Sequence, residues 1–405
     1  MRRAPIFSII FLDEIGMNIG FPILTFLCFD KKSSLFAPTV SHAVRSYWYG
    51  ILNSLPFIIA IFTVPILTWL SDYYGRKKIL LVGSLSMLGF SIFASLGIIY
   101  GTIALVIIGR IINGICARIQ PTALAVIGDI SNHKNKIINM GYLQFYISIG
   151  AFLGPLIGGY FANRFFFKQL NFSLPYLIAV GFGLLTLLFI VFGFKETLTK
   201  PIERKVSFSK IIHLLKNPTI LKISLILLLT QISWRTYYQF IPPVLKVHFH
   251  YSPQIIGLFI ALIAVWLALA TSIGLKLLDK FFTAKNILYG ACISVFLGLL
   301  LANFANHLHP SILSQIITWF AAAPIAIGDV IIYSLITTFY SNAASEHDQG
   351  KAMGINYIIV TIVWASTGIL GGCLAAININ APIIFAPISL LLLFIIFSRG
   401  NKLCI

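Results

Sequence analysis

Long apolar stretches alternate with short polar turns from one end of this sequence to the other. We predict that each apolar stretch forms a helix, and twelve can be drawn: 6–29, 47–70, 79–100, 102–130, 137–162, 172–194, 220–246, 254–278, 286–305, 311–341, 352–376 and 381–398. Runs of about 20 apolar residues are long enough to cross the hydrocarbon core of a bilayer. Because lipid offers no hydrogen bonds to the backbone, the expected fold class is an all-α membrane protein.

The longest polar stretch, 195–219, divides six of the predicted helices from the other six. We therefore predict an N-terminal six-helix bundle at 1–194, a cytoplasmic linker at 195–219 and a C-terminal bundle at 220–405. The turn Lys276–Lys285 is similar to a degenerate copy of the turn Asp72–Lys78, about half the chain earlier. This favours two pseudo-symmetric halves around a central cavity.

Composition supports the membrane interpretation. The chain of 405 residues is 59% hydrophobic and only 10% charged, whereas soluble domains carry about 25% charged residues. The net charge of +18 could indicate nucleic-acid binding, but the cations lie in short turns between apolar stretches. We therefore attribute the charge to membrane topology and expect no nucleic-acid partner.

Cations crowd the turns on one side of the predicted membrane. The turns on the other side hold only Lys31, Lys32, Arg45, Arg164, Lys168 and Lys246. Because cytoplasmic loops are enriched in Lys and Arg, we expect a multi-pass protein of the bacterial inner membrane with both termini in the cytoplasm. The first apolar stretch begins like a signal peptide, but it is too long and contains acids, so a retained helix is expected.

Other chemistry is sparse in the sequence. The five cysteines are widely scattered, and no metal-ligand spacing, nucleotide loop or catalytic cluster is recognisable. We expect no metal and no cofactor. The chain is not expected to be an enzyme, and a monomer is expected.

Several short motifs occur in order along the chain. The turn between the second and third stretches reads Asp72-Tyr-Tyr-Gly75-Arg76-Lys-Lys. The first stretch contains Leu12-Asp13-Glu14-Ile-Gly16, and the fourth contains Gly109-Arg110…Gly114 with Asp129 near its end. The fifth contains Gly150…Gly154-Pro155…Gly158-Gly159, and the turn before the eleventh reads Glu346-His-Asp-Gln-Gly350. Together they resemble motifs of the major facilitator superfamily, and they are most similar to its tetracycline–proton antiporter branch of twelve-helix drug:proton antiporters. The resemblance reaches most of the chain and is strongest in the first half.

The resemblance implies a gating latch made of Asp72, Gly75, Arg76 and Asp129. In it, Asp72 is expected at the start of the eleventh helix, whose amides favour an anion, and Arg76 pairs with Asp129. The alternative is a basic turn that only sets topology, with surface ion pairs worth about 0–1 kcal/mol.

Gly150, Gly154 and Gly158 recur every four residues and therefore share one helix face. With Pro155 and Gly159 they look like the antiporter motif. Small residues permit close helix packing and proline permits a kink. Packing alone explains the pattern, and a face that slides or bends during gating is the functional alternative.

Asp13 and Glu14 lie well inside the first predicted helix, and Arg110 matches the arginine that the family uses for proton coupling. Charged groups within a membrane are costly and usually functional, so these three residues are the predicted proton-coupling site. A carboxyl that moves between apolar surroundings and a cation can carry a proton. The alternative is an acid that is solvated near the helix end.

Arg118 and Arg235 lie inside helices of opposite halves and depart from the tetracycline pattern. Guanidinium groups suit carboxylate or phosphate, so we predict an anionic cargo, such as a polycarboxylate, an organic acid or a siderophore-like molecule. Asp329 could pair with Arg235, and a structural salt bridge is the alternative. The remaining predicted substrate-binding residues are Trp234, Tyr238, Gln239, Tyr142, Gln144 and Tyr146, although aromatic stripes often reflect packing alone.

The predicted function is therefore proton-coupled secondary transport of a small organic anion by alternating access. Two alternatives stay open. One is a multidrug or tetracycline-type proton antiporter that exports a neutral or cationic drug. The other is a receptor or assembly protein that uses the same scaffold without transport.

Overall fold

The computed structural model describes residues 4–115, 119–131, 135–162, 171–198, 214–344 and 349–399. These residues are helical throughout, with connecting turns and without strands. Among them, ten helices are long and apolar enough to cross a membrane, and a shorter apolar helical stretch covers 381–396. The prediction of an all-α membrane protein is confirmed, whereas the count of twelve spans is not.

The chain forms two compact units. Unit 1 holds Met1–Ser41, Leu55–Val206 and Tyr251–Ala264, and unit 2 holds His42–Ser54, Ser207–His250 and Val265–Ile405. Each unit thus includes a short segment from the other predicted half of the sequence. The predicted boundaries at 195 and 219 stay a prediction.

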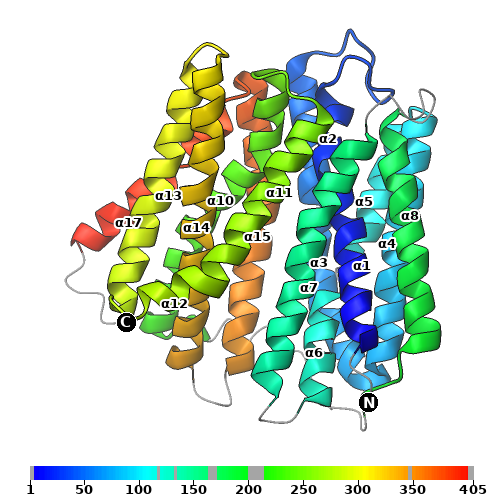
Figure 1. Cartoon of the computed structure of the whole chain (residues 1–405), viewed down its shortest axis with the longest axis vertical. Helices are drawn as coiled ribbons and strands as arrows, with labels where there is room; N and C mark the ends of the chain where they lie inside the picture. Colours follow the sequence, from blue (N-terminus) through cyan, green and yellow to red (C-terminus); the bar gives the residue numbers. More distant parts are fainter. Residues whose placement is uncertain are drawn as a thin grey trace. The chain divides into compact units, whose positions relative to one another are not determined.

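Unit 1 is built mainly from the helices of the first half of the chain (Figure 1). They are α1 (Ala4–Ile19), α2 (Phe21–Phe29), α3 (His42–Tyr74, unit 2 as far as Ser54), α4 (Arg76–Ile99), α5 (Ile103–Ile115), α6 (Gln120–Ile130), α7 (Lys136–Phe161), η1 (Asn171–Ser173), α8 (Leu174–Leu188) and η2 (Phe189–Gly193). Helix α1 packs along α7 and α8, and α4 packs along α5 and α8. Buried aliphatic residues of α1, α4, α6, α7 and η2 form one continuous core.

The first predicted helix, 6–29, is interrupted in the structure. Helix α1 ends at Ile19, and α2 begins at Phe21 with Pro22 in its first turn. Proline lacks an N–H, so one hydrogen bond of the helix ladder is missing at this point. The predicted stretch 6–29 still corresponds to one candidate span, Pro5–Phe29, and the interruption at Gly20 is a detail that the sequence did not predict.

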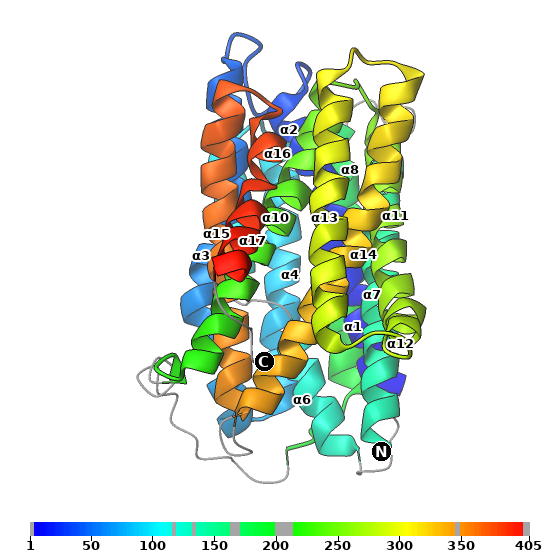
Figure 2. The same cartoon turned by 90° about the vertical axis from the view of Figure 1, so that its left-hand side faces the viewer.

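Unit 2 is built mainly from helices of the second half (Figure 2). They are α10 (Pro218–Val247), α11 (Pro253–Leu269, unit 1 as far as Ala264), η3 (Ala270–Gly274), α12 (Leu275–Leu278), α13 (Ala284–His307), α14 (Ile312–Ala343), α15 (Gln349–Ile377), α16 (Ala381–Phe385) and α17 (Ile388–Arg399). Helix α13 packs along α14, and α10 contacts both α14 and α15. The last predicted helix, 381–398, divides at Pro387 into α16 and α17.

Helix α10 is 30 residues long but is not among the ten apolar spans. Polar residues in its middle, including Gln231, Arg235 and Gln239, lower its mean hydropathy. Most of these side chains are buried against neighbouring helices, as the 0% exposure of Gln231 and Gln239 shows. A helix with a polar middle that packs inside a membrane protein is where binding chemistry is expected.

Candidate transport sites

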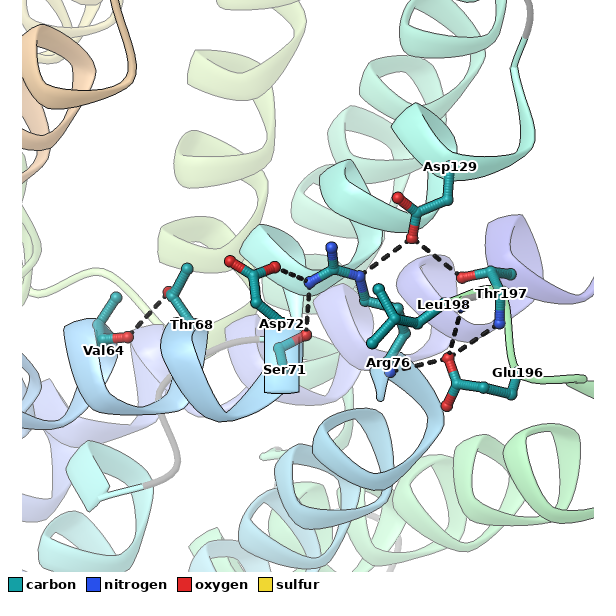
Figure 3. A network of polar contacts seen from close by, with 9 residues as sticks. All are labelled: Val64, Thr68, Ser71, Asp72, Arg76, Asp129, Glu196, Thr197 and Leu198. Atoms are coloured by element: carbon teal, nitrogen blue, oxygen red, sulfur yellow. Dashed lines mark hydrogen bonds and ion pairs between the residues drawn. The ribbon is translucent and has the colours of Figure 1, made fainter. Parts of the chain in front are cut away.

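Arg76 is the centre of an ionic network at the junction of α3 and α4 (Figure 3). Its Nε donates to Asp129 Oδ2 at 3.0 Å, and its Nη1 donates to Asp72 Oδ1 and to Ser71 Oγ. The Arg76 side chain is 4% exposed and those of Asp72 and Asp129 are 21% and 24% exposed, so these contacts are partly shielded from screening by salt. The predicted pairing of Arg76 with Asp129 is confirmed, and its role in gating stays a prediction.

Gly75 precedes α4 with a φ of +108°, a conformation that L side chains rarely adopt. It also leaves room for an acid: a Cβ at this position would lie 2.4 Å from Glu196 Oε2. The carboxylate of Glu196 instead accepts hydrogen bonds from the amides of Arg76 and Lys77, at 2.9 and 3.0 Å. The first turn of α4 is therefore capped by a residue from the end of the first half of the chain.

The carboxylate of Glu196 also accepts hydrogen bonds from its own segment. Oε1 of Glu196 also accepts from the backbone amides of Thr197 and Leu198. Partial burial acts to raise the pKa of Glu196, but the hydrogen bonds from four backbone amides outweigh it and hold the pKa below the ordinary value. Thr197 Oγ1 donates to Asp129 Oδ2 at 3.2 Å, and this is the same oxygen that accepts from Arg76 Nε. Sequence reasoning missed both Glu196 and Thr197.

Part of the predicted latch cannot be placed. The predicted contact of Asp72 with the start of the eleventh helix stays a prediction, and residues 345–348, just before that helix, lie outside the described residues. Within unit 1, Asp72 is held by Arg76 on the following turn.

The predicted glycine face of α7 lies directly against α1. A Cβ at Gly150 would be 2.6 Å from Glu14 Cβ, one at Gly154 would be 2.8 Å from the Ile15 carbonyl oxygen, and one at Gly158 would be 2.0 Å from the Ile19 carbonyl oxygen.

Two more residues of the motif lie on the same helix. Pro155 lies within α7, and Gly159 faces Pro253 of α11, where a Cβ would be 2.4 Å from the carbonyl oxygen. Close packing by the whole motif is thus a property of the structure, and a gating motion stays a prediction.

Asp13 and Glu14 are both 2% exposed inside α1. This burial is not compatible with the alternative of a solvated acid near the helix end. Asn18, one turn later, donates from Nδ2 to Glu14 Oε2 at 3.1 Å and to the Glu14 carbonyl oxygen. The amide therefore fixes the Glu14 side chain along the same face that meets Gly150.

Arg110 lies on α5 with its guanidinium carbon 5.3 Å from the centroid of the Phe90 ring. Its charge also acts on Tyr176 of α8, which is fully buried. An arginine over an aromatic face is stabilised without an acid. Arg118, the other predicted arginine of this half, lies outside the described residues.

In unit 2 the structure brings Arg235 and Asp329 to the same polar cluster, with Gln231 hydrogen-bonded to each. The guanidinium carbon of Arg235 also lies 4.4 Å from the centroid of the Trp364 ring. Tyr238 packs edge-on against this indole, at 6.1 Å between centroids. Gln231 and Trp364 were not among the predicted site residues.

The remaining predicted binding residues divide into packed and exposed side chains. Trp234 is buried against Tyr237 and Tyr238, and Gln239 donates to the Trp364 carbonyl oxygen and to Thr367. In unit 1, Tyr142 and Tyr146 pack on Phe7 of α1, and Gln144 is exposed. The packing alternative therefore explains most of this set, and cargo contact stays a prediction.

Among the described residues, no group of three or more His, Cys, Asp or Glu side chains could hold a metal ion.

Comparison with known proteins identifies the family of this chain. The family model described as the Major Facilitator Superfamily matches residues 6–368. The chain belongs to the Major Facilitator Superfamily. The superfamily is one of membrane transporters, so the chain is a multi-pass membrane protein, and the family implies a small-molecule substrate.

Relatives of this superfamily member include named resistance proteins. It is 26% identical over 322 residues to multidrug resistance protein 1 of Bacillus subtilis, covering 79% of this chain and 78% of the relative. It is 30% identical over 187 residues to the class H tetracycline resistance protein of Pasteurella multocida, covering 46% of this chain and 42% of the relative. The second match thus spans less than half of either protein.

Solved structures share the fold of this superfamily member. A POT family transporter in complex with 5-aminolevulinic acid superposes with a TM-score of 0.75 at 13% identity, over 99% of this chain and 96% of that chain. A D-xylose-proton symporter gives 0.74 at 14% identity over 98% of each chain. At such identities the likeness concerns the fold alone.

Proposed function

We propose that this protein is a proton-coupled secondary transporter that exports small, drug-like organic compounds by alternating access. The observation that carries the proposal is the burial of Asp13 and Glu14, each 2% exposed, in the first membrane helix. Ionisable groups inside a membrane are costly and usually belong to ion or substrate pathways. The resistance proteins among the relatives support export of drug-like compounds.

Proton coupling follows from general electrostatics. Burial favours the neutral form of a carboxyl group and a cation favours the ionised form, so a carboxyl that alternates between such surroundings takes up and releases a proton. In this proposal Asp13 and Glu14 carry the proton, and Arg110 is the cation of the same half. The Asn18 amide holds Glu14 in place.

The anionic cargo expected from the sequence stays a prediction with less support than a drug-like one. Arg118 lies outside the described residues. The charge of Arg235 is offset by Asp329, to which it is linked through Gln231. A single arginine whose charge is offset by a carboxylate of the same protein gives weak support for a negatively charged cargo.

We further propose the bacterial inner membrane as the location, with both termini in the cytoplasm. The bacterial relatives and the uneven distribution of Lys and Arg among the turns support this placement. A monomer that works without nucleic acid or cofactor is part of the same proposal.

Transport in reconstituted vesicles tests the function. Purified protein is placed in liposomes, a pH gradient is imposed, and movement of tetracycline, a fluoroquinolone and citrate is measured in parallel. We expect gradient-driven movement of at least one of the two drugs. Asp13→Asn or Glu14→Gln should abolish gradient-driven accumulation while exchange of labelled for unlabelled drug continues without a gradient.

Asp30→Asn is the matched control, because Asp30 lies in the turn after α2 and its Oδ1 accepts a local hydrogen bond from the Lys32 amide. It should transport like the unaltered protein. If citrate alone moved, the cargo would be an anion rather than a drug-like compound. If no probe moved, the receptor alternative would be favoured. Retained accumulation by the double variant Asp13→Asn, Glu14→Gln would refute proton coupling through α1.

A further inference from the structure

Three exposed lysines lie where α12 ends and α13 begins in unit 2 (Figure 2). They are Lys276, Lys280 and Lys285, and we call residues 276–285 the lysine turn. Among the described residues, no hydrogen bond, ion pair or ring contact involves these three side chains, and Asp279 of the same turn forms no ion pair with them. The charge of the lysine turn is therefore presented to whatever surrounds the protein.

The corresponding turn of the first half of the chain uses its cations internally. Arg76 is the centre of the ionic network at the start of α4. Lys77 donates from Nζ to the Val191 carbonyl oxygen at 2.9 Å, and Lys78 Nζ lies 5.6 Å from the centroid of the Tyr74 ring. Contacts within the protein thus account for the cations of the first turn, whereas those of its degenerate copy need another explanation.

Helix electrostatics explains only part of this charge. Lys276 lies in the last turn of α12, where a helix favours cations. Lys285 is the second residue of α13, where the amides of the first turn favour an anion and disfavour a cation. Thr283 caps this helix by accepting from the Asn286 amide, but the first turn of α13 contains no acid. An anion from outside the protein would offset the charge of Lys285.

An exposed apolar row leads into the lysine turn. Ile273, Leu277 and Phe281 follow one another at intervals of four residues and are 54%, 51% and 77% exposed. Ile273 and Leu277 share one face of the helical segment, and Phe281 follows in the turn. The row begins inside the candidate membrane span Pro253–Leu278. It is therefore a lipid-facing surface that continues beyond the end of the span.

The lysines and the apolar row alternate along the chain. Lys276 directly precedes Leu277, Lys280 directly precedes Phe281, and Phe282 adds a second exposed ring. A lysine can lay its methylene chain on apolar surface while its ammonium group stays among water and headgroups. Surfaces that combine cations with aromatic and aliphatic side chains lie where the acyl chains of a bilayer meet its headgroups.

We propose that the lysine turn is a docking surface for anionic phospholipids. The headgroup phosphate contacts the three ammonium groups, and the acyl chains lie along the apolar row. A lipid suits both features, whereas an acidic protein would have to displace lipid from a face that begins inside a membrane span. Only the choice of the cytoplasmic leaflet as the source of the lipid rests on the proposed topology.

Quenching of a local tryptophan by brominated lipid tests the docking surface. Phe281→Trp places a reporter at the end of the apolar row, and the signal of the unaltered protein with its 6 tryptophans is subtracted. The full-length protein is placed in phosphatidylcholine nanodiscs that contain a minor share of brominated phosphatidylglycerol or brominated phosphatidylcholine. We expect the anionic lipid to quench the reporter more strongly, and we expect this difference to shrink at high salt.

Matched pairs of substitutions in the reporter protein separate this surface from total charge. Lys276→Gln with Lys280→Gln should remove the difference, because each lysine near an anionic membrane surface strengthens attraction about 5-fold. Lys216→Gln with Lys222→Gln removes the same charge from exposed positions around the start of α10, and this control pair should keep the difference. Lys285→Gln alone should reduce it by a smaller amount. Thermal unfolding reports whether each variant is folded.

Several results would overturn the proposal. Equal quenching by the two brominated lipids would mean that the turn does not prefer an anionic headgroup. A difference that survives substitution of all three lysines would exclude them as the contact, and one that is lost equally in the control pair would reflect total charge. No quenching by either lipid would place the turn outside the bilayer and leave an acidic protein as its partner. Transport is not measured, so the result does not depend on the proposed function.

Discussion

The carboxylate of Glu196 lies 2.9 Å from the backbone nitrogen of Arg76, where it caps the first turn of α4. A helix begins with amides that have no partner inside the helix, and those amides favour an anion. Gly75 supplies no side chain to cap them, and the first turn of α4 contains no acid. Glu196 provides the missing acceptor from a distant part of the sequence.

Removing this acceptor should destabilise the N-terminal unit. Glu196→Gln keeps the shape but replaces a charged acceptor with a neutral one, and we expect a loss of about 0.5–1 kcal/mol, as for an exposed helix cap. Thermal unfolding in detergent near neutral pH measures it. Glu203→Gln, an acid in the stretch outside the described residues, is the comparison. Equal losses in the two variants would contradict a specific role of Glu196.

The same contact predicts a pH dependence. Because the pKa of Glu196 is lower in the folded protein than its ordinary value of 4.5, its contribution to stability is present above that value and is lost as the pH falls through the folded pKa. The difference in melting temperature between the unaltered protein and Glu196→Gln should therefore stay constant near neutral pH and shrink in acid. A difference that grows below pH 4.5 would have the wrong sign.

Gly75 and Glu196 should be coupled in a double-mutant cycle. Gly75→Ala places a Cβ 2.4 Å from Glu196 Oε2 in a backbone with a φ of +108°, and we expect a loss of about 1–3 kcal/mol. In a Glu196→Ala background the clash is absent and only the backbone strain remains. The second substitution should therefore cost less than in the unaltered protein. Additive losses, measured by denaturation, would mean that the two residues act independently.

Two glycines of one helix give opposite predictions. Gly158→Ala puts a Cβ 2.0 Å from the Ile19 carbonyl oxygen, whereas nothing lies within 4 Å of a Cβ at Gly141. We expect Gly158→Ala to destabilise by about 1–3 kcal/mol through forced separation of α1 and α7. Gly141→Ala should stabilise by about 0.5–1 kcal/mol, because alanine loses less entropy in a helix. Thermal unfolding of both variants checks the sign, and equal effects would contradict the packing described for α7.

Arg76 should not be replaceable by lysine. Its fork reaches Ser71, Asp72 and Asp129 together, and an ammonium group is a single point that cannot match this geometry. We expect Arg76→Lys to lose about 1–3 kcal/mol, because acceptors of this network lose their partners. Lys78→Arg, at an exposed position over the Tyr74 ring, should be nearly neutral. Unfolding midpoints that do not differ between the two variants would mean that charge alone holds the network.

The sequence was sufficient for the fold class and for part of the site. Apolar length predicts membrane helices regardless of how they pack, and the spacing of Asp72, Gly75 and Arg76 is dense enough to identify the turn. Helix breaks at Pro22 and Pro387 were missed, because an apolar stretch interrupted by one proline still has the length of a span. Hydropathy measures only the amount of apolar surface, and the continuity of the backbone depends on local sterics.

The polar contacts between distant segments could not be read in the same way. Glu196 lies in a charged stretch where an acid resembles any other solvated residue. The feature that could have indicated it is the start of α4, where no local side chain caps the first amides, so these amides need an acceptor from another part of the chain. Gln231 was overlooked because its side chain is neutral, and inside a predicted helix a charged residue marks a site more clearly. Only its position between Arg235 and Asp329 gives it a role.

The segment that follows η2 begins from a fixed anchor. Lys77 donates from Nζ to the Val191 carbonyl oxygen at 2.9 Å, and Glu196 holds the amides on the opposite side of the same turn. Any force on the chain beyond Leu198 is therefore transmitted first to α4 and to the Arg76 network.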